Sequence, residues 1–89
     1  MPLQTQDEAE DMVVKALATK QKVIGNEHPD TAISYFNLGC IYKRKEKYEL
    51  ALTKHENALC IRQKVFALKH PLVVESQNAV DELKRKLGF

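Results

Sequence analysis

Apolar and small residues recur at helical spacing in the middle of the chain, which predicts two closely packed helices. Residues 35–42 read Tyr-x-x-Leu-Gly-x-x-Tyr, and residues 51–58 read Ala-x-x-x-His-x-x-Ala. Gly39 lies inside the first run, where glycine costs about 1 kcal/mol relative to alanine. We therefore expect a neighbouring backbone to approach it closely. Ala51 and Ala58 are small enough to permit that approach, so the pattern predicts a tight helical hairpin.

Start and stop signals predict two helices in the first half of the chain. The first runs from about residue 6 to residue 23, because Thr5 begins a capping box and Gly25 suits a left-handed stop. The second begins at Pro29, a residue favoured in the first helical turn. It ends in the cationic run 43–45, which suits the C-terminal end of a helix dipole.

Two further helices are expected in the second half. A short polar turn leads to a third helix over about residues 48–66. The fourth opens at His70-Pro71, runs to about residue 86 and is followed by Gly88. The connecting segments are short, so neighbouring helices should pack antiparallel. No segment of the chain has a competing strand pattern.

The chain also repeats itself. A shift of 42 positions aligns eight identical residues, beginning at Ala16 and ending at Ser34, without a gap. The aligned segments are Ala16-Leu17 with Ala58-Leu59, Gln21-Lys22-Val23 with Gln63-Lys64-Val65, His28-Pro29 with His70-Pro71, and Ser34 with Ser76. A period of this size is typical of a solenoid, in which each unit buries its apolar face on the next.

The two ends of the predicted solenoid differ. The same shift places Asp81 at the position of Gly39 and Lys84 at the position of Tyr42. The fourth helix therefore lacks the residues that receive a partner and is expected to be a polar cap. The first helix matches the third but has no helix before it, so we expect part of its apolar surface to be uncovered. That surface comprises Met12, Val13 and Val14.

These residues resemble the tetratricopeptide repeat, whose pattern is W-x2-L-G-x2-Y followed by A-x3-F in a helix–turn–helix unit. Tyr35 stands in place of the Trp and His55 in place of the Phe. The resemblance covers Ala9 to about Leu83. The repeat residues are Tyr35, Leu38, Gly39, Tyr42, Ala51, His55 and Ala58.

The resemblance implies an all-α fold, with antiparallel hairpins stacked as a short right-handed superhelix (an α-solenoid). Residues 1–89 are then one domain, with a half-repeat at 6–23, a complete repeat at 29–66 and a capping helix at 70–86. The 42-residue period and the Gly-x-x-His-Pro-Asp junction resemble the longer repeats of kinesin light chains and related scaffold proteins. The second junction lacks the glycine at residues 67–68, which leaves its turn geometry open.

Composition narrows the functional classes. The chain has 89 residues, 44% apolar and 29% charged, with a net charge of +2, which is too slight to indicate nucleic acid or a membrane surface. The basic run at 43–45 has no interleaved aromatic residues and reads as a solvated helix end. No apolar run reaches the roughly 20 residues of a membrane span, and no secretory leader is expected. We expect a cytoplasmic protein, and the kinesin-light-chain resemblance allows association with the cytoskeleton.

Candidate chemistry is sparse. His28 and His70 precede prolines at helix starts, where a capping role accounts for them, and His55 occupies a packing position. Cys40 and Cys60 have neither CxxC spacing nor a flanking base motif and read as reduced structural thiols. The acidic pairs and the glycines match no catalytic or phosphate-binding pattern. We therefore expect no enzyme, no metal and no cofactor.

The remaining face of the second helix is the candidate binding surface. It carries Ile33, Phe36, Asn37, Cys40, Lys43 and Arg44, which we call the predicted groove face. In tetratricopeptide arrays this face lines a concave surface for extended peptides or helices. Phe36 offers an apolar anchor and Asn37 a hydrogen-bonding amide, while Lys43 and Arg44 favour an acidic partner. The alternative is that Ile33 and Phe36 pack against the first and fourth helices.

The sequence thus predicts a non-catalytic scaffold or adaptor module that binds a peptide or helix of a partner protein. Binding of a chaperone C-terminus is disfavoured, because Phe36 and Cys40 stand where a carboxylate clamp needs Asn and Lys. The competing hypothesis is a structural segment of a longer array with no ligand of its own, since about three repeats are usually needed for stability. A homodimer through the uncovered first helix is a further possibility.

Overall fold

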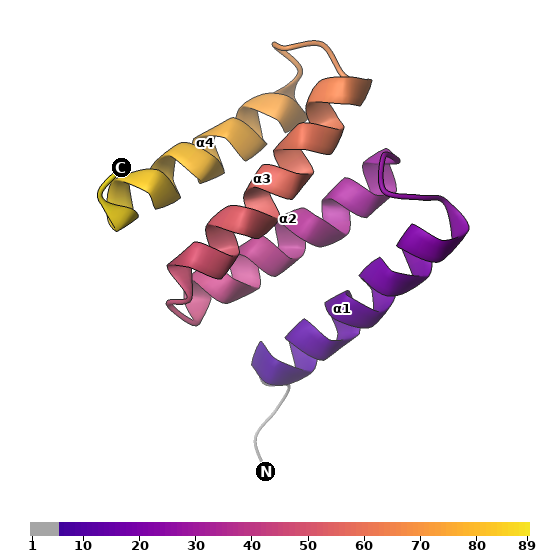
Figure 1. Cartoon of the computed structure of the whole chain (residues 1–89), viewed down its shortest axis with the longest axis horizontal. Coiled ribbons are helices and arrows are strands. Elements are labelled where there is room, and N and C mark those ends of the chain that lie inside the picture. The colour runs from indigo at the N-terminus through magenta and orange to yellow at the C-terminus, as the bar shows by residue number, and fades with distance from the viewer. Residues whose placement is uncertain (1–5) are drawn as a thin grey trace.

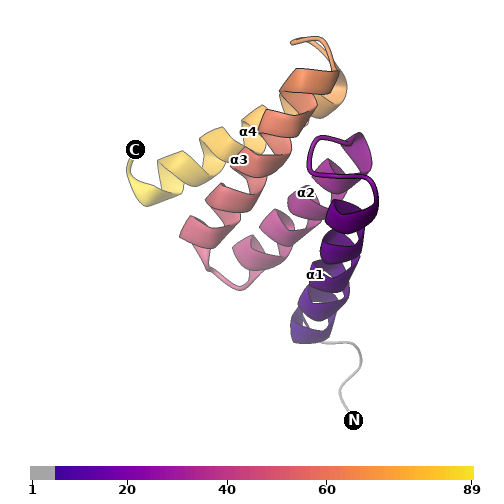
Figure 2. The same cartoon turned by 45° about the vertical axis from the view of Figure 1, so that its right-hand side comes forward.

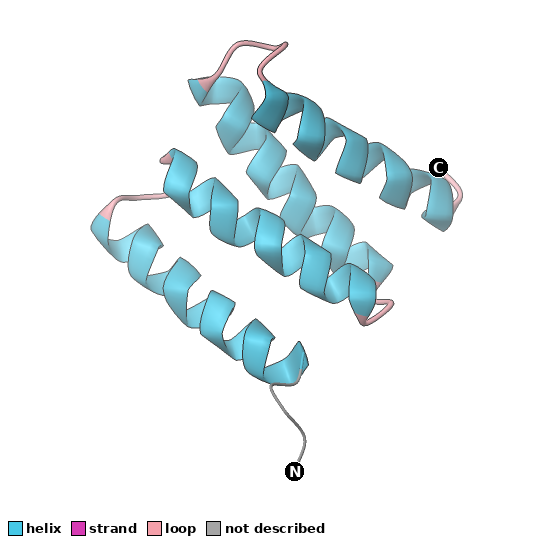
Figure 3. Cartoon of the chain, turned by 180° about the vertical axis from the view of Figure 1, so that it is seen from behind, coloured by secondary structure: helices cyan, strands magenta, loops and turns pink. Residues whose placement is uncertain are grey.

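Residues 6–89 form four helices joined by short loops, and the part of the chain that the structure describes contains no strand (Figure 1). This structure is a computed structural model. The helices are α1 (Gln6–Val23), α2 (Pro29–Arg44), α3 (Tyr48–Val65) and α4 (Pro71–Leu87). They stack in chain order, with α1 and α4 at opposite ends and α2 and α3 between them (Figure 3). The prediction of an all-α fold with four helices is confirmed, and each predicted boundary lies within a residue or so of the observed one.

The starts of α2 and α4 are built in the same way. The Nδ1 atom of His28 accepts a hydrogen bond from the backbone N–H of Asp30 at 3.0 Å. His70 Nδ1 accepts one from the N–H of Leu72 at 3.1 Å. Each bond satisfies an N–H group that has no partner inside the helix, so the predicted capping role of both histidines is confirmed. The capping box predicted for α1 depends on Thr5, which lies outside the described residues.

The helix ends repeat as well. Glu46, after α2, and Gly88, after α4, are both left-handed, with φ values of 61° and 88°. The bonds around them recur 42 residues apart: Glu46 N–H to Lys43 C=O (2.9 Å) and Lys47 N–H to Tyr42 C=O (2.8 Å), then Gly88 N–H to Arg85 C=O (3.2 Å) and Phe89 N–H to Lys84 C=O (2.8 Å). The internal period therefore extends to the turns.

The two junctions that lead into α2 and α4 differ. Gly25 is left-handed with a φ of 85°, which confirms the predicted stop. The second junction turns without a glycine. There Phe66 is extended, at φ −117° and ψ 158°, and the N–H of His70 bonds the carbonyl of Ala67 at 2.9 Å.

The core lies along α2 and α3 and receives side chains from α1 and α4. One cluster joins Leu17 of α1 to Val80 and Leu83 of α4 through residues of α2 and α3. A second, smaller cluster holds Ala32, Ala58 and Ile61. Six of the seven repeat residues are buried, and Tyr35 is half-buried, where its hydroxyl accepts a hydrogen bond from Gln21 Nε2 at 2.9 Å.

Glycine is required at position 39 because the His55 side chain, and not a backbone segment, fills the space next to it. A Cβ atom at this position would lie 2.5 Å from Nε2, 2.6 Å from Cδ2 and 2.8 Å from Cε1 of His55. The prediction that a neighbouring backbone approaches Gly39 was therefore wrong. The imidazole of α3 fills the space that a side chain on α2 would need. Ala51 and Ala58 are fully buried on either side of that histidine along α3.

The two ends of the stack differ in polarity as expected. The helix α1 lies at one end of the stack, beside α2 (Figure 2). On this helix Met12 is 61% and Val14 42% exposed, whereas Val13 is half-buried against the core. On α4, Asp81 accepts a hydrogen bond from Gln77 Nε2 at 3.0 Å, and Lys84 is exposed. The outer side of α4 is therefore polar where the matching side of α2 is packed.

Candidate functional site

A cavity of about 260 Å³ lies where α2, α3 and α4 meet. Three members of the predicted groove face line it, namely Phe36, Cys40 and Lys43. His55 of α3 contributes to the lining, and α4 supplies the remaining residues, which are Asn78, Ala79, Glu82 and Leu83. The cavity thus joins an aromatic and cationic wall on α2 to a polar and anionic wall on α4.

His55 is an uncharged part of this lining. Its side chain is almost completely buried, and burial, together with the charges of Lys43 and Arg62, lowers the pKa of the imidazole to about 4. The ring is therefore neutral at neutral pH. Its Nδ1 atom has no hydrogen-bond partner within residues 6–89.

The ring of Phe36, a residue of α2, packs against side chains of α3. Its ring meets the ring of His55 edge-on, with centroids 4.6 Å apart and planes at 72°, and the guanidinium of Arg62 lies 5.0 Å from its centroid. The ring is only half-buried and borders the cavity, so it remains available as an apolar contact. These contacts join Phe36 to α3, and Ile33 is 43% exposed, while the alternative that both residues pack against the first and fourth helices stays a prediction.

The charged residues around the cavity are mostly paired. Lys43 Nζ and Glu82 Oε1 are 2.6 Å apart, so this ion pair joins α2 to α4. The contact lowers the pKa of the Glu82 carboxyl. Arg62 is buried, and its guanidinium donates to Ser76 Oγ at 2.8 Å and to Glu75 at 3.3 Å. Arg44 is exposed and forms no ion pair with another residue in the described range 6–89.

Not all members of the predicted groove face line the cavity. Ile33, Asn37 and Arg44 are exposed on α2 and do not line it. Cys40 is half-buried inside it, and burial raises the pKa of its thiol, which makes the thiolate scarce. Cys60 is exposed on α3 and lies outside this cavity.

The α4 wall was missing from the sequence-based site, although the repeat contains the signal for it. A shift of 42 positions places Asn78 on Phe36, Ala79 on Asn37 and Glu82 on Cys40. The groove face of α2 therefore has a direct counterpart on α4. The repeat therefore aligns the two groove walls just as it aligns Gly39 with Asp81 and Tyr42 with Lys84.

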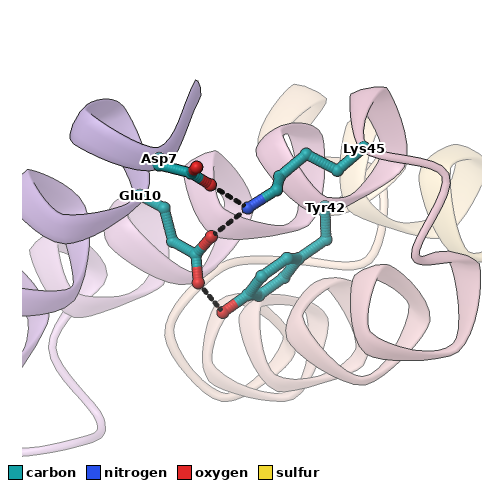
Figure 4. Close-up of polar contacts among 4 residues, drawn as sticks. All are labelled: Asp7, Glu10, Tyr42 and Lys45. Carbon is teal, nitrogen blue, oxygen red and sulfur yellow. Dashed lines mark hydrogen bonds and ion pairs between the residues drawn. The ribbon is translucent and has the colours of Figure 1, made fainter. Parts of the chain in front are cut away.

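A separate polar cluster joins α1 to α2 (Figure 4). Lys45 Nζ lies 2.6 Å from Asp7 Oδ1 and 2.7 Å from Glu10 Oε1, and the Tyr42 hydroxyl donates to Glu10 Oε2 at 2.9 Å. Hydrogen bonds and charge from Lys45 lower the pKa of both carboxyls. From the sequence, Lys45 was expected only to interact with the dipole of its own helix, whereas the structure shows that it also forms ion pairs with α1.

The described residues contain neither a metal-binding cluster nor a membrane-spanning helix. No group of three or more histidine, cysteine, aspartate or glutamate side chains in residues 6–89 is arranged to hold a metal ion. None of the four described helices has the length and apolar composition that crossing a bilayer requires.

Comparison with known proteins gives two matches. The tetratricopeptide repeat family model matches residues 3–64. The chain is also 28% identical over 82 residues to the RxLR effector protein SFI4 of Phytophthora infestans (strain T30-4), which covers 92% of this chain. The chain spans about a quarter (24%) of that relative's length. Since the family match takes in most of the chain, including the hairpin built on Gly39 and His55, the chain belongs to the tetratricopeptide repeat family.

Proposed function

We propose that the chain is a non-catalytic protein-interaction module that holds a peptide segment or helix of a partner protein in a groove between α2 and α4. The groove comprises the cavity together with the exposed Ile33, Asn37 and Arg44 of α2. The observation that carries the proposal is the cavity itself. Three members of the predicted groove face line it, and its lining combines the aromatic ring of Phe36 with the charged side chains of Lys43 and Glu82.

The chemistry of the groove suits binding better than catalysis. The half-exposed ring of Phe36 provides apolar contact area, and the exposed amide of Asn37 can bond a partner's backbone. Arg44 is available for an acidic side chain. The two groups that resemble catalytic residues are unsuited to that role at neutral pH, because the Cys40 thiol has a raised pKa and the His55 imidazole a lowered one.

The length of the repeat supports a proposal about the kind of tetratricopeptide repeat that this chain contains. The 42-residue period and the His-Pro junction favour a repeat of the kinesin-light-chain kind, and with it a cytoplasmic scaffold or adaptor, with the cytoskeleton as one setting. Residues 1–89 then act as one unit, with a complete repeat at 29–66 between a half-repeat and a capping helix.

A pull-down with variants tests the proposal. The immobilised chain is exposed to a cytosolic extract, and the retained proteins are compared among wild type, Phe36→Ala, Arg44→Glu and the control Lys15→Glu, which changes an exposed residue of α1. We expect both groove variants to lose proteins that wild type and the control retain. Identical retention by all four chains would refute groove binding. Arg44 is exposed, so its replacement leaves the core intact.

Self-association through α1 is a second candidate function. The observation that favours it is the exposure of apolar side chains on this terminal helix, such as Val23 at 73%. An isologous contact between two α1 helices would give a dimer. Sedimentation velocity over a hundredfold range of concentration tests it, and a monomer throughout that range would exclude it.

A further inference from the structure

We propose that the groove selects partner segments carrying a carboxylate side chain, and that this carboxylate takes the place of Glu82 on Lys43. The inference rests on the proposed function, because it names the chemistry of the segment that the groove holds. Glu82 then has two roles: it pairs with Lys43 while the groove is empty, and it competes with the ligand for that cation.

The position of the ion pair supports this exchange. Lys43 and Glu82 both line the cavity, from opposite walls, with their charged ends 2.6 Å apart. Their side chains are 37% and 45% exposed, so solvent reaches both. A segment that fills the cavity must lie against this contact or open it. Ion pairs this exposed contribute little to stability, so opening this one costs little.

The arrangement of charges favours an acidic ligand over a basic one. Glu75 and Glu82 each have a cationic partner already, in Arg62 and Lys43 respectively. Arg44 has none among the described residues. A ligand carboxylate would therefore gain Lys43 by exchange and Arg44 in addition. A ligand ammonium would gain Glu82 only by displacing Lys43, and it would meet the charge of Arg44.

The positive charges of Lys43 and Arg44 both influence the same side chain in the cavity, Cys40. Both cations lower the pKa of the Cys40 thiol inside the cavity, which burial otherwise raises. Their fields therefore overlap at the cavity wall, and the half-buried ring of Phe36 provides apolar surface in the same cavity. A carboxylate beside an apolar side chain would occupy both parts, which defines the expected sequence feature of the partner as an acidic residue next to an apolar one.

Selection from a random peptide library tests the inference. A phage-displayed library of decapeptides is panned against the full chain as wild type, Glu82→Gln, Lys43→Gln and the control Glu56→Gln, which makes the same chemical change at an exposed position of α3 outside the cavity. We expect aspartate and glutamate to be enriched in the wild-type pool. The best acidic peptide should bind Glu82→Gln about two- to fivefold more tightly than wild type. It should bind Lys43→Gln more weakly and the control equally.

The possible results distinguish a failure of the carboxylate exchange from a failure of groove binding itself. If wild type selects peptides without acidic enrichment, or if Glu82→Gln binds the acidic peptide no more tightly, the exchange is refuted and groove binding stands. If wild type selects no peptide at all, the proposed function itself fails. Enrichment of lysine and arginine would show that the groove prefers the opposite charge and would overturn the inference.

Discussion

Replacement of Gly39 by alanine tests the close contact on which the hairpin depends. The new methyl group would lie 2.5–2.8 Å from three atoms of the His55 ring, well inside the distance at which carbon and nitrogen atoms repel. The ring is only 2% exposed and is met edge-on by Phe36, so it cannot swing into solvent. Either the ring or the helices must move.

The sign of the effect depends on two opposing terms. Alanine in place of glycine inside a helix stabilises by about 1 kcal/mol. Overpacking of a filled core costs about 1–3 kcal/mol. Because the atoms that block the methyl group belong to a buried ring, we expect the upper part of that range. The net result is a loss of about 1–2 kcal/mol in the free energy of unfolding.

Urea denaturation followed by circular dichroism measures this loss. The matched control is the same change in a His55→Ala background, where the methyl group meets no ring. There Gly39→Ala should stabilise the protein, by up to about 1 kcal/mol. The reversal of sign between the two backgrounds is the specific result, because it isolates the pairwise contact. Stabilisation by Gly39→Ala in the wild-type background, or equal effects in both, would refute the account of Gly39.

Three further predictions follow from polar contacts. Folding lowers the pKa of His55 from 6.5 to about 4, so between pH 6.5 and 4 the unfolded chain binds a proton that the folded chain does not. The free energy of unfolding should therefore fall as the pH drops through this window, and urea titrations should show a smaller fall in His55→Phe. Lys45→Met removes two ion pairs that join the end of α2 to α1, so amide hydrogen exchange should quicken in α1 and stay unchanged in α4. The control Lys22→Met, which alters an exposed lysine of α1, should leave exchange in both helices unchanged. His28→Ala and His70→Ala each remove a helix cap, and each should lower the free energy of unfolding in urea by about 0.5–1 kcal/mol. The two losses should add in the double variant because the caps belong to different helices, and a departure from the sum larger than the smaller single loss would contradict this.

The sequence was sufficient for the parts of the fold that depend on neighbours along the chain. Helix caps, left-handed stops and the periodicity of apolar positions act within about four residues, so His28, His70 and Gly25 could be interpreted without coordinates. The 42-residue period then supplied the order of packing, because equivalent helices in a solenoid have equivalent neighbours. The family match over residues 3–64 agrees with that interpretation.

Contacts between side chains of different helices were beyond this reasoning. Gly39 was correctly recognised as a point of close approach, yet the approaching group was misidentified. The reason is that the rotamer of His55 and the crossing of α2 and α3 decide whether a ring or a backbone fills the space. Lys45 was likewise assigned to its own helix end, because nothing in local spacing indicates that Asp7 and Glu10 lie within 3 Å of its ammonium.

The internal repeat separates residues that build the frame from residues that distinguish one groove wall from the other. Two positions of the shared core keep their character over 42 residues, since Ser34 and Ser76 are both buried and Leu38 corresponds to the buried Val80. Gly39 and Tyr42, by contrast, correspond to Asp81 and Lys84, which are less buried. Several groove positions change theirs, as Phe36 becomes Asn78, Asn37 becomes Ala79 and Cys40 becomes Glu82, whereas the cations Lys43 and Arg44 correspond to Arg85 and Lys86.

A groove with identical walls would hold a segment in either direction with equal energy. Here α2 lines the cavity with an aromatic ring and the cation of Lys43, whereas α4 contributes the amide of Asn78 and the carboxylate of Glu82. The two walls therefore attract different side chains, and a bound segment should adopt one preferred orientation. The Lys43–Glu82 ion pair is a consequence of the same divergence, since it requires opposite charges on helices that the repeat would otherwise make alike.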